Sequence, residues 1–222
     1  MVRSDADRQY DYYPAFLDLV RKRVVVVGGG EIATGKVRGL LPCGVDPLVV
    51  IAPEVSPLIA EHAAQGRLQW HARPYEHGDL AGADLAFAAT DDRAANATVA
   101  REARERGIPV LAVDDIPNCD FIAPAIVKRD HLTVAISTNG HSPALASHLR
   151  RTLEAIVSPQ WGDLLAVAAE VRRRLGPDRA RVSPAEWQAA LDDEVKRLVW
   201  AGELESATEL LFARLMPVAV AR

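Results

Sequence analysis

Four consecutive β-branched residues, Val24 to Val27, run directly into the sequence Gly28-Gly29-Gly30-Glu31-Ile32-Ala33. A buried strand that enters Gly-x-Gly-x-x-Ala and continues into a helical stretch, here Glu31 to Leu41, is typical of a dinucleotide-binding fold. In such a unit Gly28 permits the tight turn, Gly30 lets the backbone approach a pyrophosphate, and Ala33 lets the helix pack close to the strand. The amino end of the helix then offers N–H groups to the phosphates. The alternative interpretation is a structural turn that binds no ligand.

Further apolar runs alternate with helical patterns, which is the order of a doubly wound parallel sheet. We interpret Gly39 as a close-packing site in the first helix and Pro42 to Gly44 as its end. Thr90-Asp91-Asp92 provides a polar cap for a later helix that Gly107 closes. The remaining expected strands are Pro47 to Ile51, Leu68 to His71, Ala83 to Ala89 and Pro109 to Val113, and the helices are Glu54 to Ala64 and Arg93 to Arg106.

The pattern changes after Asp114. Two short strands, Phe121 to Val127 and His131 to Ser137, flank Lys128-Arg129-Asp130 and predict a hairpin or a pair of neighbouring strands outside the first sheet. Ser142 is placed to cap a helix that begins at Pro143. Only helices are expected from there on, in Ala144 to Ile156, Trp161 to Leu175, Pro184 to Trp200 and Glu203 to Leu215.

The predicted fold class is therefore α/β, with three parts. Residues 1–117 form an NAD-binding domain with a Rossmann-type parallel sheet. Residues 118–151 form a small mixed α/β dimerisation segment, because two short strands are marginal by themselves and need a partner surface. Residues 152–222 form a helical C-terminal domain.

Composition limits the possible partners. The formal net charge of -4 gives no global attraction to nucleic acid or to an anionic membrane, so an acidic ligand must be held by local basic clusters. No apolar stretch reaches the roughly 18 residues of a membrane span, and the N-terminus has no signal-peptide core. Cys43 and Cys119 lack metal-ligand spacing and suggest reduced thiols in a cytoplasmic protein. Met1 to Asp11 is expected to be a disordered lead-in.

Several motifs beyond the glycine turn occur together. They are Gly28-Gly29-Gly30-x-x-Ala33 with Lys36, Ala89-Thr90-Asp91-Asp92, Val113-Asp114-x-x-Pro117, Phe121-Ile122-x-Pro124-Ala125 and Ala135-Ile136-Ser137-Thr138-Asn139-Gly140-x-Ser142-Pro143. Their order and spacing resemble those of precorrin-2 dehydrogenases, the dehydrogenase and ferrochelatase units of siroheme biosynthesis, from Tyr12 to Leu175. We expect no counterpart of the methyltransferase module that is fused to some bacterial members.

The resemblance implies oxidation of the tetrapyrrole precorrin-2 to sirohydrochlorin, with NAD⁺ accepting a hydride and the substrate losing a proton. Whether the chain also inserts Fe²⁺ into sirohydrochlorin stays open. Asp114 ends the fifth expected strand, at the sheet edge where open α/β folds place their ligands. In the family an aspartate at this position is the proposed acid/base and metal-associated group, so Asp114 is the implied catalytic residue. The alternative is that Asp114, or Asp115, only caps the next turn.

The resemblance also places the stretch around Ser137 beside the tetrapyrrole pocket. Serine hydroxyls and loop N–H groups can orient substrate carboxylates, although a helix-capping turn equally explains Ser142. Because precorrin-2 carries carboxylates around its ring, the pocket needs cations. Besides Lys128 and Arg150, the candidates nearest to this stretch in the sequence are Arg129, His148 and Arg151. The implied substrate-binding residues are Ser137, Asn139, Gly140, Ser142, Lys128 and Arg150. No metal ligand is predicted.

NAD is the expected cofactor. The second strand ends in Ile51-Ala52-Pro53, without the acidic residue that often binds ribose hydroxyls about 20 positions after the glycines. The resemblance implies that backbone groups bind the ribose instead. The same stretch has no arginine for a 2′-phosphate, which favours NAD⁺ over NADP⁺. The predicted cofactor-binding residues are Gly28, Gly30, Glu31, Ile32, Ala33, Ala52, Pro53, Thr90 and Asp91, the last of which has a helix cap as its alternative role.

A homodimer is expected through about Asn118 to Arg151, because the short strands need a partner surface and because family members exchange this region between subunits. The alternative function is an NAD(H)-sensing regulatory module without catalysis. Such a module fits the first 113 residues but does not explain the segment from Asp114 to Pro143.

Overall fold

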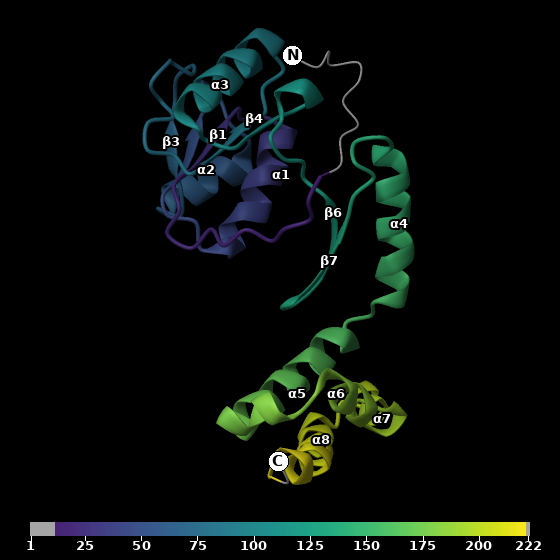
Figure 1. The fold of residues 1–222 in the computed structure, drawn as a ribbon. Coiled ribbons are helices and arrows are strands. Elements are labelled where there is room, and N and C mark those ends of the chain that lie inside the picture. The colour runs from purple at the N-terminus through teal and green to yellow at the C-terminus, as the bar shows by residue number, and fades with distance from the viewer. Residues whose placement is uncertain (1–11, 221–222) are drawn as a thin grey trace, which may run out of the picture. The chain divides into compact units, whose positions relative to one another are not determined.

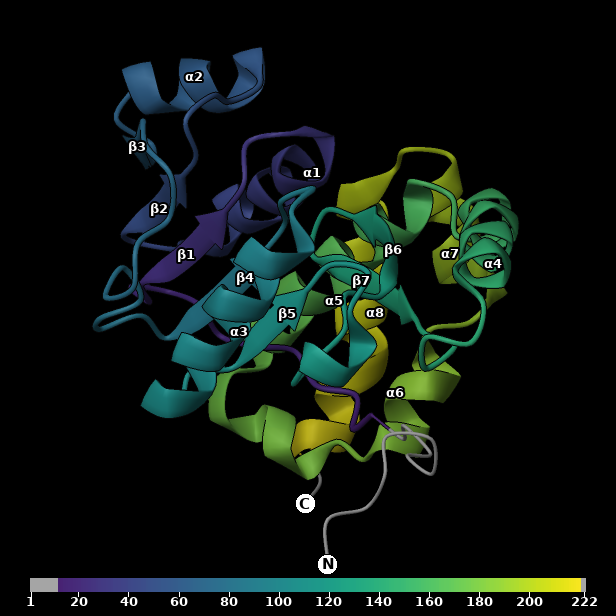
Figure 2. The same ribbon diagram turned by 90° about the horizontal axis from the view of Figure 1, so that it is seen from above.

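The valine run forms the central strand of a five-stranded parallel sheet in the computed structural model, which describes residues 12–220 and the side chains of residues 12–216. The order across the sheet is β3-β2-β1-β4-β5, and Figure 2 shows the strands side by side in this order. The strand order changes direction at β1, as in a Rossmann-type sheet, which confirms the predicted fold class. The strands are β1 (Val24–Val27), β2 (Leu48–Ile51), β3 (Gln69–His71), β4 (Leu85–Ala88) and β5 (Val110–Ala112).

Helices cover both faces of this sheet (Figure 1). α1 (Glu31–Leu40) and α2 (Pro57–Ala64) pack on one face, and α3 (Arg93–Arg106) packs on the other. Alternate valines of β1 point to opposite helix layers, and none is more than 2% exposed. A parallel sheet covered on both sides buries every side chain of its central strands, which explains the unbroken valine run.

Capping residues define both ends of α3 and the start of α2. Asp92 begins α3 by accepting the N–H groups of Ala94 and Ala95 at 2.8 and 3.2 Å, and Gly107 ends it with a φ of 68°. The predicted start of α2 at Glu54 is wrong, because Ser56 caps the helix and Pro57 is its first residue.

The first helix ends where the sequence predicts, but Gly39 does not have the predicted packing role. A 3₁₀ turn, Leu41–Cys43, follows α1 and leads to Gly44 with a φ of 69°. The interpretation of Gly39 as a close-packing site is wrong, because a Cβ built there meets nothing within 4 Å.

The chain forms two compact units. The first contains the sheet, up to Ala123, together with Asn139–His141, and the second contains Pro124–Thr138 and the residues from Ser142 onward. The three-part division at residues 117 and 151 stays a prediction. The expected lead-in Met1 to Asp11 lies outside the described residues.

A hairpin and a long helix open the second unit. β6 (Ala125–Arg129) pairs antiparallel with β7 (Leu132–Ile136), and α4 (Pro143–Ile156) packs on them. The predicted turn over residues 128–130 is displaced, because Lys128 and Arg129 belong to β6. Asp130 takes a left-handed φ of 50°, which aspartate adopts more readily than most residues.

The strand expected from Phe121 is also shorter than predicted, since its first residues belong to the sheet unit. Phe121 packs edge-on against Phe87 there, with 5.4 Å between the ring centroids.

Four helices with a common buried core complete the second unit. They are α5 (Gln160–Leu175), α6 (Pro184–Ala190), α7 (Asp193–Trp200) and α8 (Leu204–Val220). No helix among the described residues is long and apolar enough to cross a membrane.

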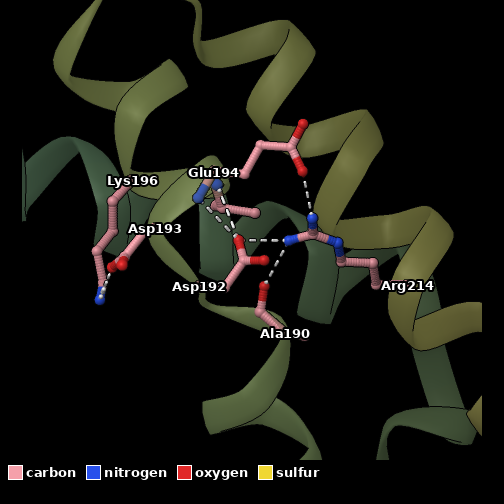
Figure 3. A network of polar contacts seen from close by, with 7 residues as sticks. Ala190, Asp192, Asp193, Glu194, Lys196 and Arg214 are labelled. Atoms are coloured by element: carbon pink, nitrogen blue, oxygen red, sulfur yellow. Dashed lines mark hydrogen bonds and ion pairs between the residues drawn. The ribbon is translucent and has the colours of Figure 1, made fainter.

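The prediction of a single helix from Pro184 to Trp200 is wrong, because the helix is interrupted after Ala190 and a new one begins at Asp193. The Asp192 carboxylate accepts the N–H groups of Glu194 and Val195 and thereby begins α7. Figure 3 shows that Arg214 of α8 donates both to Asp192 and to Glu194, at 2.5 and 2.7 Å. The break is therefore stabilised by a partner from a distant helix.

Candidate functional site

The three glycines after β1 differ in what surrounds them. A Cβ on Gly28, whose φ is 126°, would lie 2.2 Å from the carbonyl oxygen of Ala89. A Cβ on Gly29 would lie 1.9 Å from the carbonyl oxygen of Glu54. At Gly30 a Cβ would meet nothing within 4 Å. The protein's own backbone therefore requires the first two glycines, whereas the third borders open space.

That open space is part of a pocket of about 700 Å³ at the carboxyl ends of β1, β2 and β4. Its volume lies within the usual range of small-molecule sites. The lining residues come from the glycine turn and the start of α1, from the loops after β2 and β3, and from the segment between β4 and α3. They are Val27, Gly28, Gly29, Gly30, Glu31, Ile32, Ile51, Ala52, Pro53, Glu54, Pro74, Tyr75, Ala89, Thr90, Asp91, Asp92 and Ala95.

The turn fits the pyrophosphate of a dinucleotide. Gly30 is the N-cap residue of α1, and no side chain caps this helix end. Behind the turn, Ser56 donates its N–H to the Gly29 carbonyl at 2.9 Å, and the Thr34 hydroxyl donates to the Gly30 carbonyl at 2.9 Å. A rigid, uncapped helix start with an open glycine in front of it is a suitable place for a phosphate group.

The structure brings eight of the nine predicted cofactor residues together in this pocket. Ala33 is the exception, because it is fully buried and packs in the core between α1 and the sheet. Its role is to allow the close helix packing that the motif requires.

The pocket wall also contains Glu54, Pro74 and Tyr75, which are not among the predicted cofactor residues. An acidic residue, Glu54, stands two positions beyond Ala52 in the loop after β2. Glu54 is exposed, and its carboxylate has no hydrogen bond or ion pair with any residue in the described part of the chain. A wider search of the loop after β2 would have found it, whereas no local signal pointed to Tyr75.

The segment after β4 is held by a buried amide. Asn96 is 3% exposed, accepts the Thr90 hydroxyl at 2.8 Å and donates to the Thr90 carbonyl at 2.9 Å. Because Asp92 caps α3, the alternative role of Asp91 as that cap is wrong. Asp91 is exposed in the pocket wall.

Asp114 follows β5 at the same sheet edge. Ala88 of β4 pairs with Ala112 of β5, so Asp114 and Thr90 each stand two residues beyond this pair. Asp114 is exposed and has a left-handed φ of 56°, a strained conformation that is found more often at functional sites.

The carboxylates of Asp114 and Asp115 differ in their contacts. The Asp115 carboxylate accepts the Asn118 side-chain N–H at 2.6 Å and stabilises the following turn. Within residues 12–216 the Asp114 carboxylate has no hydrogen bond or ion pair. Of these two aspartates, Asp115 is therefore the one whose carboxylate has a structural contact in the next turn.

The six predicted substrate residues do not line the pocket and are distributed over both units. Asn139 and Gly140 form a turn with φ values of 50° and 80° in the first unit, and the other four lie in the second. Ser142 accepts the Leu145 N–H at 3.2 Å, which confirms its capping role, and Ser137 is exposed after β7.

The basic residues near this segment have different environments. Lys128 is exposed, whereas Arg150 pairs with Glu154 at 2.6 Å. Arg129 donates to the carbonyls of Glu154 and Val157 at the end of α4 and therefore has a structural role.

Among the described residues, the cysteine thiols and the acidic side chains form no candidate metal site. Both cysteines are free, and burial raises the pKa of the Cys119 thiol, which donates to the Ala112 carbonyl at 3.0 Å. No group of three or more His, Cys, Asp or Glu side chains among the described residues could hold a metal ion.

Comparison with known proteins gives consistent results. Residues 15–125 match the family described as "Putative NAD(P)-binding", and residues 129–156 match the one described as "Sirohaem biosynthesis protein central". A "Siroheme synthase" from Methylococcus capsulatus is 39% identical over 203 residues, covering 90% of this chain and 43% of that protein. One from Azotobacter vinelandii is 39% identical over 208 residues, covering 92% and 44%.

Among solved structures, "SirC, precorrin-2 dehydrogenase" has a TM-score of 0.72 and 29% identity, covering 89% of this chain and 99% of that one. The chain thus spans less than half the length of the curated relatives but almost all of this structural neighbour.

Proposed function

We propose that this chain, which belongs to the NAD(P)-binding family matched over residues 15–125, oxidises precorrin-2 to sirohydrochlorin with NAD⁺ as the hydride acceptor. The observation that carries the proposal is the likeness to a precorrin-2 dehydrogenase over 99% of its length. The pocket geometry supports it, because the glycine turn fits a dinucleotide. The alternative of a regulatory NAD(H) sensor gains no support from relatives that are named for synthesis or dehydrogenation.

The oxidation removes a hydride and a proton from the substrate. Bound NAD⁺ would accept the hydride, and a basic side chain of the protein can accept the proton. We assign this role to Asp114, because its carboxylate is exposed, lies at the sheet edge that carries the pocket, and has no partner within residues 12–216. A carboxylate within hydrogen-bond reach of the ring can accept such a proton.

Substrate binding is assigned to Ser137, Asn139, Gly140, Ser142, Lys128 and Arg150. The Lys128 ammonium is exposed and suited to a substrate carboxylate. The Arg150–Glu154 pair is partly exposed, and such pairs contribute only about 0–1 kcal/mol, so a substrate carboxylate can compete for the arginine.

The substrate segment is also the proposed dimer interface. Leu145, Leu149 and Ile156 share one face of α4 and are 49%, 38% and 62% exposed. Ile126 of β6 is 47% exposed as well. A second copy of the chain would cover these side chains and extend the two-stranded sheet, which is too small to be stable alone.

Glu54 is the proposed ribose-binding residue. A carboxylate at the end of the second strand accepts hydrogen bonds from the ribose hydroxyls and repels a 2′-phosphate. Its place in the pocket wall supports a preference for NAD⁺ over NADP⁺.

Insertion of Fe²⁺ into sirohydrochlorin is a second candidate activity, favoured by relatives named siroheme synthase. Removal of pyrrole protons during metal entry needs a base, and Asp114 is the candidate for it too. A cytoplasmic location stays an expectation from the sequence.

The test is incubation of the purified protein with precorrin-2 and NAD⁺. We expect sirohydrochlorin and NADH in equal amounts, and no product when NAD⁺ is omitted. Absence of NADH from folded protein would reject the proposal. Subsequent addition of Fe²⁺ measures the second activity, and metal insertion no faster than without protein would limit the chain to dehydrogenation.

A further inference from the structure

The loop between β3 and β4 contributes Pro74 and Tyr75 to the pocket wall. This loop is anchored from behind by Glu102 of α3, whose side chain is 0% exposed. One carboxylate oxygen accepts the Tyr75 hydroxyl and, at 2.8 Å, the Gly78 N–H. The other accepts the Arg106 Nε–H at 2.6 Å. Glu102 therefore connects the C-terminal half of α3 to a residue of the pocket wall.

The charges of this cluster favour a fixed hydrogen bond. Burial alone raises the pKa of Glu102, but the hydrogen bonds from Tyr75 and Gly78, together with Arg106, outweigh burial and leave the pKa below its ordinary value. Burial, followed by the bond to Glu102, raises the pKa of Tyr75 above its ordinary value. The phenol thus stays protonated and donates to an ionised carboxylate, a strong type of hydrogen bond.

A second carboxylate holds the other side of the loop. Asp79 binds both terminal nitrogens of Arg73, at 2.8 and 2.6 Å, and accepts the Glu76 N–H at 2.8 Å. The guanidinium of Arg73 lowers the pKa of Asp79. Tyr75 therefore lies between two fixed points, and its ring is pre-oriented before any ligand binds.

We propose that Tyr75 forms the adenosine wall of the dinucleotide pocket and that Glu102 is the residue that positions it. The proposal rests on the NAD binding proposed above. The pyrophosphate fits at Gly30, and Asp114 marks the β5 side as the place of the chemistry, which leaves the side of β2 and β3 for the adenosine half. An aromatic ring, with Pro74 beside it, offers a flat apolar surface suited to a purine base.

The test separates the two halves of the cofactor by calorimetry on the full chain. ADP-ribose carries the adenosine, and nicotinamide mononucleotide lacks it. We expect Tyr75→Ala to weaken ADP-ribose binding about tenfold, the usual effect of losing one base–aromatic contact. Nicotinamide mononucleotide binding, measured in the same way, should stay as in the wild type. Tyr75→Phe keeps the ring but loses its hydrogen bond to Glu102, so ADP-ribose affinity should fall less than in Tyr75→Ala, by about threefold.

Glu102→Gln tests the positioning role, because an amide presents an N–H group where the buried carboxylate accepts donors. We expect weaker ADP-ribose binding and a higher KM for NAD⁺ at unchanged kcat. Glu105→Gln, an exposed carboxylate on the same helix, is the matched control and should change neither. If Glu102→Gln does not fold, Tyr75→Phe removes the same hydrogen bond from the other side.

Unchanged ADP-ribose affinity in Tyr75→Ala, or an equal loss for nicotinamide mononucleotide, overturns the inference while leaving the proposed dehydrogenation intact. A wild-type protein that binds neither ADP-ribose nor NAD⁺ overturns both. A protein that binds ADP-ribose as expected but does not oxidise precorrin-2 supports the adenosine wall and rejects only the proposed reaction.

Discussion

The parallel sheet and the β6–β7 hairpin differ in how far their side chains are buried. Every residue of β1, β2, β4 and β5 is buried, since helices of the same chain cover both faces. In the hairpin only Val127 is buried, and on α4 only Ala146. The sheet region leaves carboxylates exposed at its carboxyl edge, whereas the hairpin and α4 leave leucine and isoleucine exposed.

The difference separates ligand chemistry from association. Unpartnered carboxylates at a sheet edge are suited to bind and transfer protons. Leaving a carboxylate exposed to water costs little free energy. An uncovered apolar face lowers its free energy by meeting another such surface. Mutations in the two regions should therefore affect different measurements.

The largest effect is expected from Asp114→Asn. The amide keeps the shape of the side chain but cannot accept the proton, so kcat for precorrin-2 oxidation should fall about 10²- to 10⁴-fold. NAD⁺ affinity should stay unchanged. Asp115→Asn is the control, because that carboxylate stabilises a turn. Near-normal turnover in Asp114→Asn would mean that the proton leaves to solvent or to another group, with Ser137 the next candidate.

The double variant Leu145→Asp/Leu149→Asp tests the other region. Burying two leucines at an interface contributes about 3–6 kcal/mol, so two charges there should raise the dimer dissociation constant at least about 100-fold. Sedimentation measures the effect, and Arg151→Asp, on a different face of α4, serves as control. A wild-type protein that is monomeric and active at micromolar concentration contradicts the dimer.

Gly28→Ala and Gly30→Ala compare the effect of a methyl group at two glycines of the same turn. A Cβ at Gly28 collides with the Ala89 carbonyl, so the free energy of unfolding should fall by about 1–3 kcal/mol or more. A Cβ at Gly30 meets no protein atom within 4 Å, so stability should change by less than about 0.5 kcal/mol. NAD⁺ affinity should nevertheless fall about tenfold, because the methyl group occupies the phosphate position.

Denaturant unfolding and calorimetry measure these two quantities separately. Equal behaviour of the two glycine variants would contradict the distinction between a glycine required by the fold and one that leaves space for a ligand.

The smallest effect is expected from Glu54→Gln. Removal of the charge should lower the preference for NAD⁺ over NADP⁺ about fivefold, since the carboxylate no longer repels a 2′-phosphate. Kinetics with both cofactors measure the ratio, and Glu61→Gln, an exposed change on α2, is the control. An unaltered ratio would assign the preference to backbone groups at Ala52 and Pro53.

Features that depend on residues close together in the chain are predictable from the amino-acid sequence. The strand and glycine turn at Val24 to Gly30, the end of α3 at Gly107, and the capping of α4 by Ser142 were all predictable. Each depends on backbone propensities and hydrogen bonds within a few positions. The sequence also places Asp114 just after the fifth strand, at the sheet edge where open α/β folds bind ligands, and its catalytic role stays a prediction.

Features that need distant partners become visible only in the folded chain. Tyr75 enters the pocket wall because Glu102, which follows it by 27 positions, binds its hydroxyl from behind. The break before α7 begins with the local cap at Asp192 and is further stabilised by Arg214, whose charge reaches Asp192 from another helix. No local pattern contains such pairs, because their energies arise only when the chain has folded and excluded water around them.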